Sequence, residues 1–208
     1  ELMRKADKAL YLAKEKGKNR HIIYEERLHG KLESDDMQNM AMAYAVSKEK
    51  KREVITKMIS ELCVSGVNSI VKKEERLQQI RSLFDLDGIT IYSESGAQLV
   101  CRNGNYMVEV PDGRGLFEDE KYLALFGDDD NFIESNTLKL RFQDPAAFAV
   151  MQKQEIGASL QCLSRKEGVP NVIVNYDVFN RNRKWSDEDI TLLTILGHCI
   201  GNLLNYSE

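Results

Sequence analysis

The stretch from Lys184 to Leu204 joins an acidic beginning to apolar residues at helical spacing. Ser186 is a favourable N-cap, and Asp189 lies three residues later, where its carboxylate can reach back to the capping residue. The apolar positions that follow recur every three or four residues, with further apolar residues beside them: Ile190, Leu192, Leu193, Ile195, Leu196, Cys199, Ile200, Leu203 and Leu204. A face this wide predicts a helix with two partners, which we expect to be a sheet and a second helix.

A helix from Lys48 to Ser65 is predicted by a second run of apolar residues with the same period. Its apolar side consists of Val54, Ile55, Met58, Ile59, Leu62 and Cys63. Turn-forming residues end it, and a further helix follows whose apolar side consists of Ile70, Val71, Leu77, Ile80, Leu83 and Phe84. We expect the helix 48–65 and the C-terminal helix to lie side by side on one face of a sheet.

Apolar runs and alternating patterns predict strands at residues 89–92, 98–102, 137–142, 157–163 and 171–179. A short turn at Ser95 and Gly96 makes the first two antiparallel neighbours, and the last run is apolar enough to be central. Residues 103–136 are irregular. A short helix is expected at 146–152, because Asp144 can cap it and the following proline fits its first turn. Elements in this order predict a single α+β domain.

A chain of 208 residues can hold one ordinary domain with extensions, and 42% hydrophobic and 30% charged residues are typical of a globular protein. With a formal net charge of -4, the chain does not have the excess of basic residues that nucleic-acid binding requires. No apolar run is long enough to span a bilayer. We therefore expect a cytoplasmic protein without a nucleic-acid partner. The charge changes from basic in residues 1–31 to acidic in residues 84–208, and the chain does not begin with Met, so we expect a piece of a longer protein.

The chain has four cysteines: Cys63, Cys101, Cys162 and Cys199. They form neither a CxxC motif nor a Cys/His cluster. All four fall in apolar patterns, which predicts reduced and buried thiols. A lone helical histidine such as His198 is more typical of packing than of haem ligation.

The sequence contains no catalytic motif: no serine-centred elbow, no HExxH and no phosphate-binding loop. The triplet Asp128 to Asp130 lacks the spaced oxygens and the closing glutamate of a calcium loop, so a solvated loop is expected there. We expect neither catalysis nor a metal site in this fragment.

The first residues carry a resemblance to a signalling enzyme. Apolar residues up to Ala13 predict a helix, and a strand-like run follows at His21 to Tyr24. The segment ADKALYLAKEKGKNRHIIY, residues 6–24, resembles the closing helix and strand of a GGDEF domain, the diguanylate cyclase fold. The GG(D/E)EF signature itself is absent, so residues 1–25 are expected to be a remnant without cyclase activity, followed by a partly helical linker at 26–47. The resemblance implies a parent chain in bacterial cyclic-di-GMP signalling.

The order of elements over residues 48–206 resembles the GAF fold. The resemblance is carried by FDLDGITIY, residues 84–92, and by VIVNYDVFNRNRKWSDEDITLLTILGHCIGNLL, residues 172–204. It implies a PAS-related antiparallel sheet of five to six strands, with the first and last helices on one face and a ligand pocket on the other. Members of that family bind cyclic nucleotides, bilins, haem or small metabolites, and many of them dimerise or relay signals.

Aromatic and guanidinium side chains in and around the irregular segment are the candidate pocket residues. They are Arg102, Tyr106, Phe117, Tyr122, Phe126 and Arg141. Asn175 matches the cyclic-nucleotide-binding branch of the family, but Tyr176 and Ile190 replace its Lys and Glu, so cyclic AMP and cyclic GMP are not expected. No cysteine for phytochrome-type bilin attachment lies in residues 103–136. We therefore expect no cofactor and leave open an unidentified small ligand.

Together the two resemblances favour a regulatory GAF-like module that senses a small ligand, dimerises and acts on a GGDEF domain of the same parent chain. The dimer interface is expected on the terminal helices, at Ile55, Ile59, Leu62, Leu193 and Ile200. One alternative is a purely structural dimerisation domain without a ligand. The other is a small redox enzyme, similar to the GAF-like methionine sulfoxide reductases, that uses Cys101 and Cys162.

Overall fold

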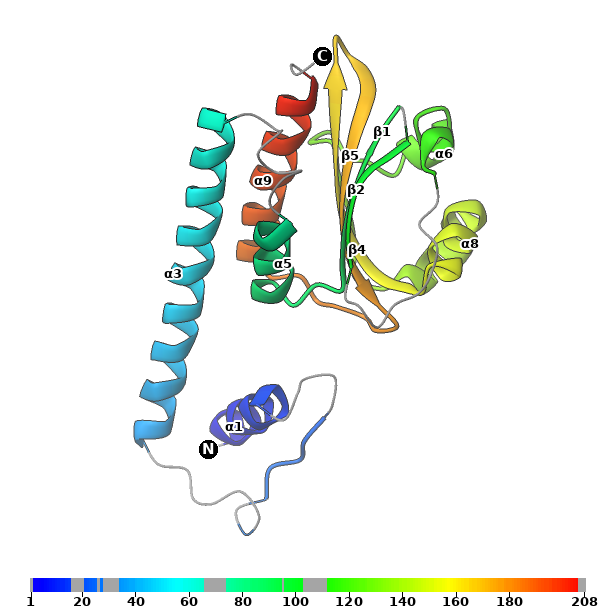
Figure 1. Cartoon of the computed structure of the whole chain (residues 1–208). Coiled ribbons are helices and arrows are strands. Elements are labelled where there is room, and N and C mark those ends of the chain that lie inside the picture. Colours follow the sequence, from blue (N-terminus) through cyan, green and yellow to red (C-terminus); the bar gives the residue numbers. More distant parts are fainter. Residues whose placement is uncertain are drawn as a thin grey trace. The chain divides into compact units, whose positions relative to one another are not determined.

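The part of the chain that the computed structural model describes is shown in Figure 1 and comprises residues 2–15, 21–25, 27, 34–65, 74–94, 96–102 and 112–205. These residues belong to two compact units, 1–50 and 51–208, and each unit is described by itself. Among them, no helix is long and apolar enough to cross a membrane.

The first unit contains helix α1 (Leu2–Glu15) and the beginning of the long helix α3 (Ser34–Ser65). α3 starts well before Lys48, where the apolar period predicts its first turn. The segment 26–47, expected to be a partly helical linker, belongs to this helix from Ser34 onward.

The strand-like run at His21 to Tyr24 does not form a strand. Residues 21–25 have no regular secondary structure. A strand needs a neighbour for its backbone hydrogen bonds, and the described residues of this unit include no second strand.

Within the described residues, the second unit is built on a five-stranded antiparallel sheet with the strand order β2-β1-β5-β4-β3. The strands are β1 (Gly88–Ser93), β2 (Gly96–Arg102), β3 (Asn131–Glu134), β4 (Ile156–Lys166) and β5 (Val169–Phe179). This topology confirms the predicted α+β class, the antiparallel sheet and the central position of the last strand.

The third strand lies outside the segment in which the alternating pattern predicts it. Residues 137–142 form two short helices instead, and of the alternating residues only Leu140 is buried, while Leu138 and Phe142 are exposed. Asn136 caps the first of these helices by accepting a hydrogen bond from the Leu138 N–H (3.1 Å). The two helices are η2 (Thr137–Lys139) and α7 (Leu140–Gln143).

Further short helices cover the same side of the sheet (Figure 1). They are η1 (Arg114–Phe117), α6 (Glu120–Leu123) and α8 (Pro145–Lys153). As predicted, Asp144 caps α8, because its carboxylate accepts hydrogen bonds from the N–H groups of Ala146 and Ala147 (both 3.1 Å).

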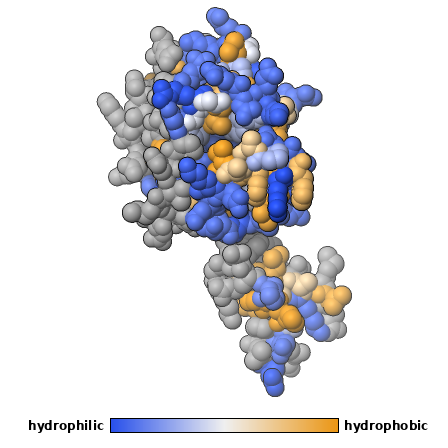
Figure 2. All heavy atoms as spheres, turned by 90° about the vertical axis from the view of Figure 1, so that its right-hand side faces the viewer, coloured by the Kyte–Doolittle hydropathy of each residue, from blue (hydrophilic) through white to orange (hydrophobic). Residues whose placement is uncertain are grey.

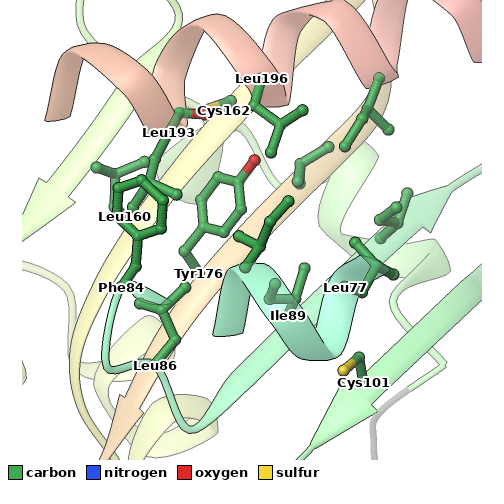
Figure 3. Close-up of a cluster of buried hydrophobic side chains, with 14 of the residues drawn as sticks. Leu77, Phe84, Leu86, Ile89, Cys101, Leu160, Cys162, Tyr176, Leu193 and Leu196 are labelled. Atoms are coloured by element: carbon green, nitrogen blue, oxygen red, sulfur yellow. The ribbon is translucent and has the colours of Figure 1, made fainter. Parts of the chain in front are cut away.

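The long helices cover the other face of the sheet (Figure 1). Beside α3 from Lys51 onward, they are α5 (Glu74–Leu83) and α9 (Asp187–Asn205). Figure 3 shows Tyr176 of β5 pointing into the core that Leu77 of α5 and Leu193 of α9 share. The expected arrangement of first and last helix on one face is therefore confirmed, whereas Ile70 and Val71, the expected start of the middle helix, lie outside the described residues.

Two glycines let α9 approach β4 closely. A Cβ atom on Gly197 would lie 2.6 Å from the Cys162 Sγ, and one on Gly201 would lie closer still to the Ser164 Oγ. Since real Cβ atoms do not approach other atoms so closely, the helix reaches this position only because both residues lack a side chain.

A partly buried ion-pair cluster joins α3 to the beginning of α9. Asp189 accepts hydrogen bonds from Lys51 Nζ (2.5 Å) and from Arg183 Nη2 (2.9 Å). As predicted, Ser186 caps the helix, because its Oγ accepts the Asp189 N–H (3.1 Å). The carboxylate of Asp189 does not reach back to the cap, since the two cations hold it.

The residues expected at a dimer interface lie in this core instead. Ile55, Leu62, Leu193 and Ile200 are at most 2% exposed, and Ile59 packs against the same cluster. For these four buried residues the placement contradicts their assignment to an interface, because a side chain without exposed surface cannot contact a second chain. Ile59 is only partly buried, so its assignment stays a prediction. Dimerisation itself stays a prediction.

Replacing Gly197 by alanine is expected to lower the free energy of unfolding by about 1–2 kcal/mol, which urea denaturation measures. Overpacking a core costs about 1–3 kcal/mol, and the better helix propensity of alanine offsets at most about 1 kcal/mol. The exposed Asn202 of the same helix provides the control, because Asn202→Ala should change stability by less than about 0.5 kcal/mol. A more stable Gly197→Ala variant would show that α9 does not rest closely on β4.

Candidate ligand-binding pocket

The sheet face opposite α3 and α9 carries a cavity of about 290 Å³. Residues of β1, β4 and β5 line it from below, and residues of η1, α6 and α8 line its sides. Figure 2 views the molecule from this side and shows apolar side chains gathered among hydrophilic ones. The volume lies just below the range that is usual for small-molecule sites, about 300–1,000 Å³. The apolar lining residues are Leu116, Ala146, Ala147, Val150, Met151 and Ile156.

The floor of the cavity is polar, unlike its sides. Four of the side chains that β4 and β5 direct to this face are polar and at most 6% exposed: Ser159, Gln161, Asn175 and Asp177. Gln161 and Asn175 line the cavity itself. The strand register sets Gln161 opposite Asn175 and Ser159 opposite Asp177. Burying polar side chains in the middle of a sheet costs free energy unless they are hydrogen-bonded. Four of them on one face therefore need hydrogen-bond partners, and a group left without one indicates a place for a ligand.

A chain of hydrogen bonds crosses this floor. The Tyr122 hydroxyl donates to Gln161 Oε1 (2.5 Å), and Gln161 Nε2 donates to Ser159 Oγ (3.0 Å). The Ser159 hydroxyl in turn donates to Asp177 Oδ1 (2.6 Å). Gln161 and Ser159 each accept one bond and donate the next, and the chain ends on an acceptor, which fits an ionised Asp177.

Burial raises the pKa of Asp177 to about 6, and the hydrogen bond from Ser159 and the charge of Arg102 oppose this shift only in part. The charge of the floor therefore changes close to neutral pH. Burial also raises the pKa of Tyr92 and that of Tyr122, so both phenols remain neutral hydrogen-bond donors.

Two buried polar atoms at the floor have no hydrogen-bond partner among the described residues: Asn175 Oδ1 and Thr90 Oγ1. Asn175 lines the cavity, and Thr90 lies opposite it on β1. Leaving such an atom unpaired costs about 1–3 kcal/mol. A ligand that donates an N–H or O–H to Asn175 would recover this energy.

Arg102 lies at the edge of the cavity. Its Nη2 donates to Gln154 Oε1 (2.9 Å), and its guanidinium carbon lies 5.2 Å from the centre of the Phe179 ring. Since Gln154 lines the cavity, Arg102 orients a lining residue and adds positive charge near Asp177.

The structure brings some of the predicted pocket residues to the cavity. Tyr122 lines it, and Arg102 lies at its edge. Phe126 packs edge-on against Tyr122, with ring centres 5.7 Å apart, and supports the lining from behind. Phe117 packs into the apolar cluster on this face without lining the cavity.

The prediction for Arg141 was wrong, because this residue is exposed on α7 where the pattern predicts a strand. Tyr106 lies outside the described residues. The floor residues are absent from the sequence-based candidates, although Gln161 and Asn175 are polar residues in the middle of predicted strands. A buried polar position of this kind is the signal that could have found them.

A redox pair at Cys101 and Cys162 does not fit the sheet. Both thiols are buried, but they lie on β2 and β4, which β1 and β5 separate. Three strand spacings place them about 14 Å apart, beyond the reach of a disulfide. Cys63, expected to be buried, is exposed. Nor do the described residues include a group of three or more His, Cys, Asp or Glu that could hold a metal ion.

The stability of the protein is expected to fall as pH rises from about 4 to about 6. Folded Asp177, with a pKa of about 6, keeps its proton in a range where the unfolded chain, with a pKa of 3.8, has lost it. At about 1.4 kcal/mol per pH unit, the buried charge costs about 3 kcal/mol above pH 6. Asp177→Asn should remove this dependence in urea denaturation at pH 4.5 and pH 7.5, and Asp128→Asn, at an exposed carboxyl, should not. Parallel profiles for the Asp177 variant and the unchanged protein would contradict the raised pKa.

The chain is similar to solved structures of phytochrome-type GAF domains, although no family model and no curated protein matches it. The phycoerythrobilin-bound GAF domain from a cyanobacterial phytochrome gives a TM-score of 0.58 at 10% identity, over 78% of this chain and 97% of that one. The chromophore-binding domain of Stigmatella aurantiaca bacteriophytochrome gives 0.58 at 15% identity, over 76% of this chain and 60% of that one. JSC1_58120g3 with bound biliverdin IXa gives a TM-score of 0.53 at 12% identity, over 73% of this chain and 97% of that one.

These similarities correct the expectation that no cofactor is involved. Two of the three similar structures hold a bilin, phycoerythrobilin in one and biliverdin in the other, so the fold does accommodate a cofactor. At identities of 10% to 15% the similarity extends to the fold and not to the ligand. The second unit of this chain has the fold of a GAF domain.

Proposed function

We propose that this chain is a sensor domain that binds a small planar molecule in the cavity and relays its presence to α3. The observation that carries the proposal is the unpaired acceptor of Asn175 in an otherwise largely apolar cavity. Protein cores avoid such atoms, whereas binding sites use them to orient a molecule. The bilin-holding structures of the same fold support a sensor role.

The lining favours a flat ring system that carries a donor and an acceptor on one edge. Asn175 offers an acceptor, and Gln154, whose Oε1 is taken by Arg102, can donate from its Nε2. Leu116 and Met151 provide apolar contact for the faces of a ring. One or two rings suit a volume of about 290 Å³, and a bilin would need the sides of the cavity to move outward.

A path from the ligand to α3 runs through β5. Asn175 belongs to this strand, and Arg183 follows the strand after a short segment. Arg183 binds Asp189, which also binds Lys51 of α3. A shift of β5 on ligand binding would therefore change how α3 is held against α9.

The resemblance of residues 6–24 to the end of a GGDEF domain supports a role in bacterial cyclic-di-GMP signalling. In that setting the sensor regulates a cyclase in the same parent chain. The check is to measure cyclic-di-GMP formation from GTP by the parent protein, with and without a compound that binds this domain.

A structural dimerisation domain without a ligand is the second candidate. Val64 of α3 is 85% exposed, and Ile195 of α9 is 49% exposed. A dimer formed through these helices would bury both side chains. This candidate requires no compound in the cavity.

A thermal-shift screen of nucleobases, small aromatic metabolites and biliverdin tests the sensor. We expect at least one compound to raise the unfolding midpoint, because binding to the folded state alone stabilises it. Val150→Trp, at the 43% exposed edge of the cavity, should abolish this shift, since the indole fills the space. Asn175→Ala should weaken the affinity about tenfold, the worth of one hydrogen bond to a buried acceptor.

Val169→Trp is the matched control, because Val169 is 59% exposed and does not line the cavity. This variant should keep the shift. A screen without a stabilising compound, or equal shifts in both tryptophan variants, would reject the pocket and favour the dimerisation domain.

A further inference from the structure

Two of the four cysteines belong to the helices that the ion-pair cluster joins. Cys63 lies on α3 and is exposed, and Cys199 lies on α9 and is partly buried against the core. The other two, Cys101 and Cys162, are buried in the sheet. The pair on the helices is therefore the accessible one.

The register of the two helices places Cys63 beside Cys199. The side chain of Arg52 on α3 donates to Glu188 on α9 (2.6 Å) across a separation of 136 residues. The helices run in the same direction (Figure 1), and each cysteine lies eleven residues beyond its member of this pair. Eleven residues make about three full turns and about 16 Å of rise, so each helix presents the same face again.

The surroundings of Cys199 agree with this register. Burial raises the pKa of its thiol, and the adjacent Cys63 thiol, with which it shares a hydrogen bond, raises it further. Leu62 and Ile200, the residues next to the two cysteines, are both buried in the core between the helices and the sheet. The two sulfur atoms thus meet at the rim of that core.

We propose that Cys63 and Cys199 form a reversible disulfide that fastens α3 to α9 when the protein meets hydrogen peroxide. The exposed Cys63 thiolate attacks the peroxide oxygen, which gives a Cys63 sulfenic acid and hydroxide. The Cys199 sulfur then attacks the sulfenic sulfur and displaces its hydroxyl group as water. In total two thiols and one peroxide give one disulfide and two waters, and the two electrons pass from sulfur to peroxide. Thiol reductants reverse the reaction by exchange.

The bond would act on the same contact that the sensor uses. Lys51 and Arg52 hold α3 to α9 through side-chain tips at one point. A covalent link three turns further along fixes the spacing and the register of the two helices. Oxidation and ligand binding would then be two separate inputs to the position of α3.

Mass spectrometry of the whole chain treated with a small excess of hydrogen peroxide tests the proposal. We expect a monomer lighter by two hydrogens, a Cys63–Cys199 linked peptide after digestion without reductant, and the original mass after dithiothreitol. Cys63→Ser and Cys199→Ser should each abolish the linked peptide. A covalent dimer, Cys63 oxidised to sulfinic acid with Cys199 still a thiol, or a different linked pair would overturn the proposal.

A displaced thiol provides the geometric control. The double variant Cys63→Ser, Val64→Cys keeps four cysteines and moves the thiol about 100° around α3, to a position that is 85% exposed. It should yield at most a tenth of the linked peptide that the unchanged chain yields under the same treatment. Equal yields would show that the register of the helices does not select the pair.

Discussion

Burial of β5 on both faces is the constraint on which the second unit depends. The strand pairs with β1 on one side and β4 on the other, and its side chains alternate between two different environments. Val174, Tyr176 and Val178 supply the core beneath the long helices, whereas Asn175 lines the cavity and Asp177 lies buried on the same face of the strand. A slip of one residue would exchange the two sets, so packing and site enforce the same register.

Periodicity predicts most of the architecture because the long elements repeat their signals. The C-terminal helix has several turns of apolar period and a good cap at Ser186, and its observed bounds differ little from the expected ones. β3 has only four residues, of which two are apolar, so no period can develop in it. Leu138, Leu140 and Phe142 alternate as in a strand, yet a capped turn at Asn136 directs them into short helices.

The pocket is harder to predict than the fold, because its lining depends on which side chains of each strand point to the face with the short helices. Tyr122 could be predicted because a large aromatic side chain in a segment that covers a sheet face is expected to pack against that face. Gln161 and Asn175 carry a weaker signal, because a polar residue within an apolar run also occurs at sheet edges. The prediction for Arg141 was wrong because it assumed a strand at residues 137–142, where the chain is helical. Cys63 lies at the border of the apolar face of α3, where helical spacing does not distinguish buried from exposed side chains.

The contact of α9 with β4 through Gly197 and Gly201 has a consequence for motion in this unit. Turning the helix about its axis would drive a neighbouring side chain into the strand, and sliding it by one residue would bring a Cβ atom to a place that only hydrogen can occupy. α9 is therefore fixed in position against the sheet. Any mechanical output of the domain has to be carried by the outer helix α3, which shares the apolar core with this fixed part and is held to it at one point by the charged side chains of Lys51 and Arg52.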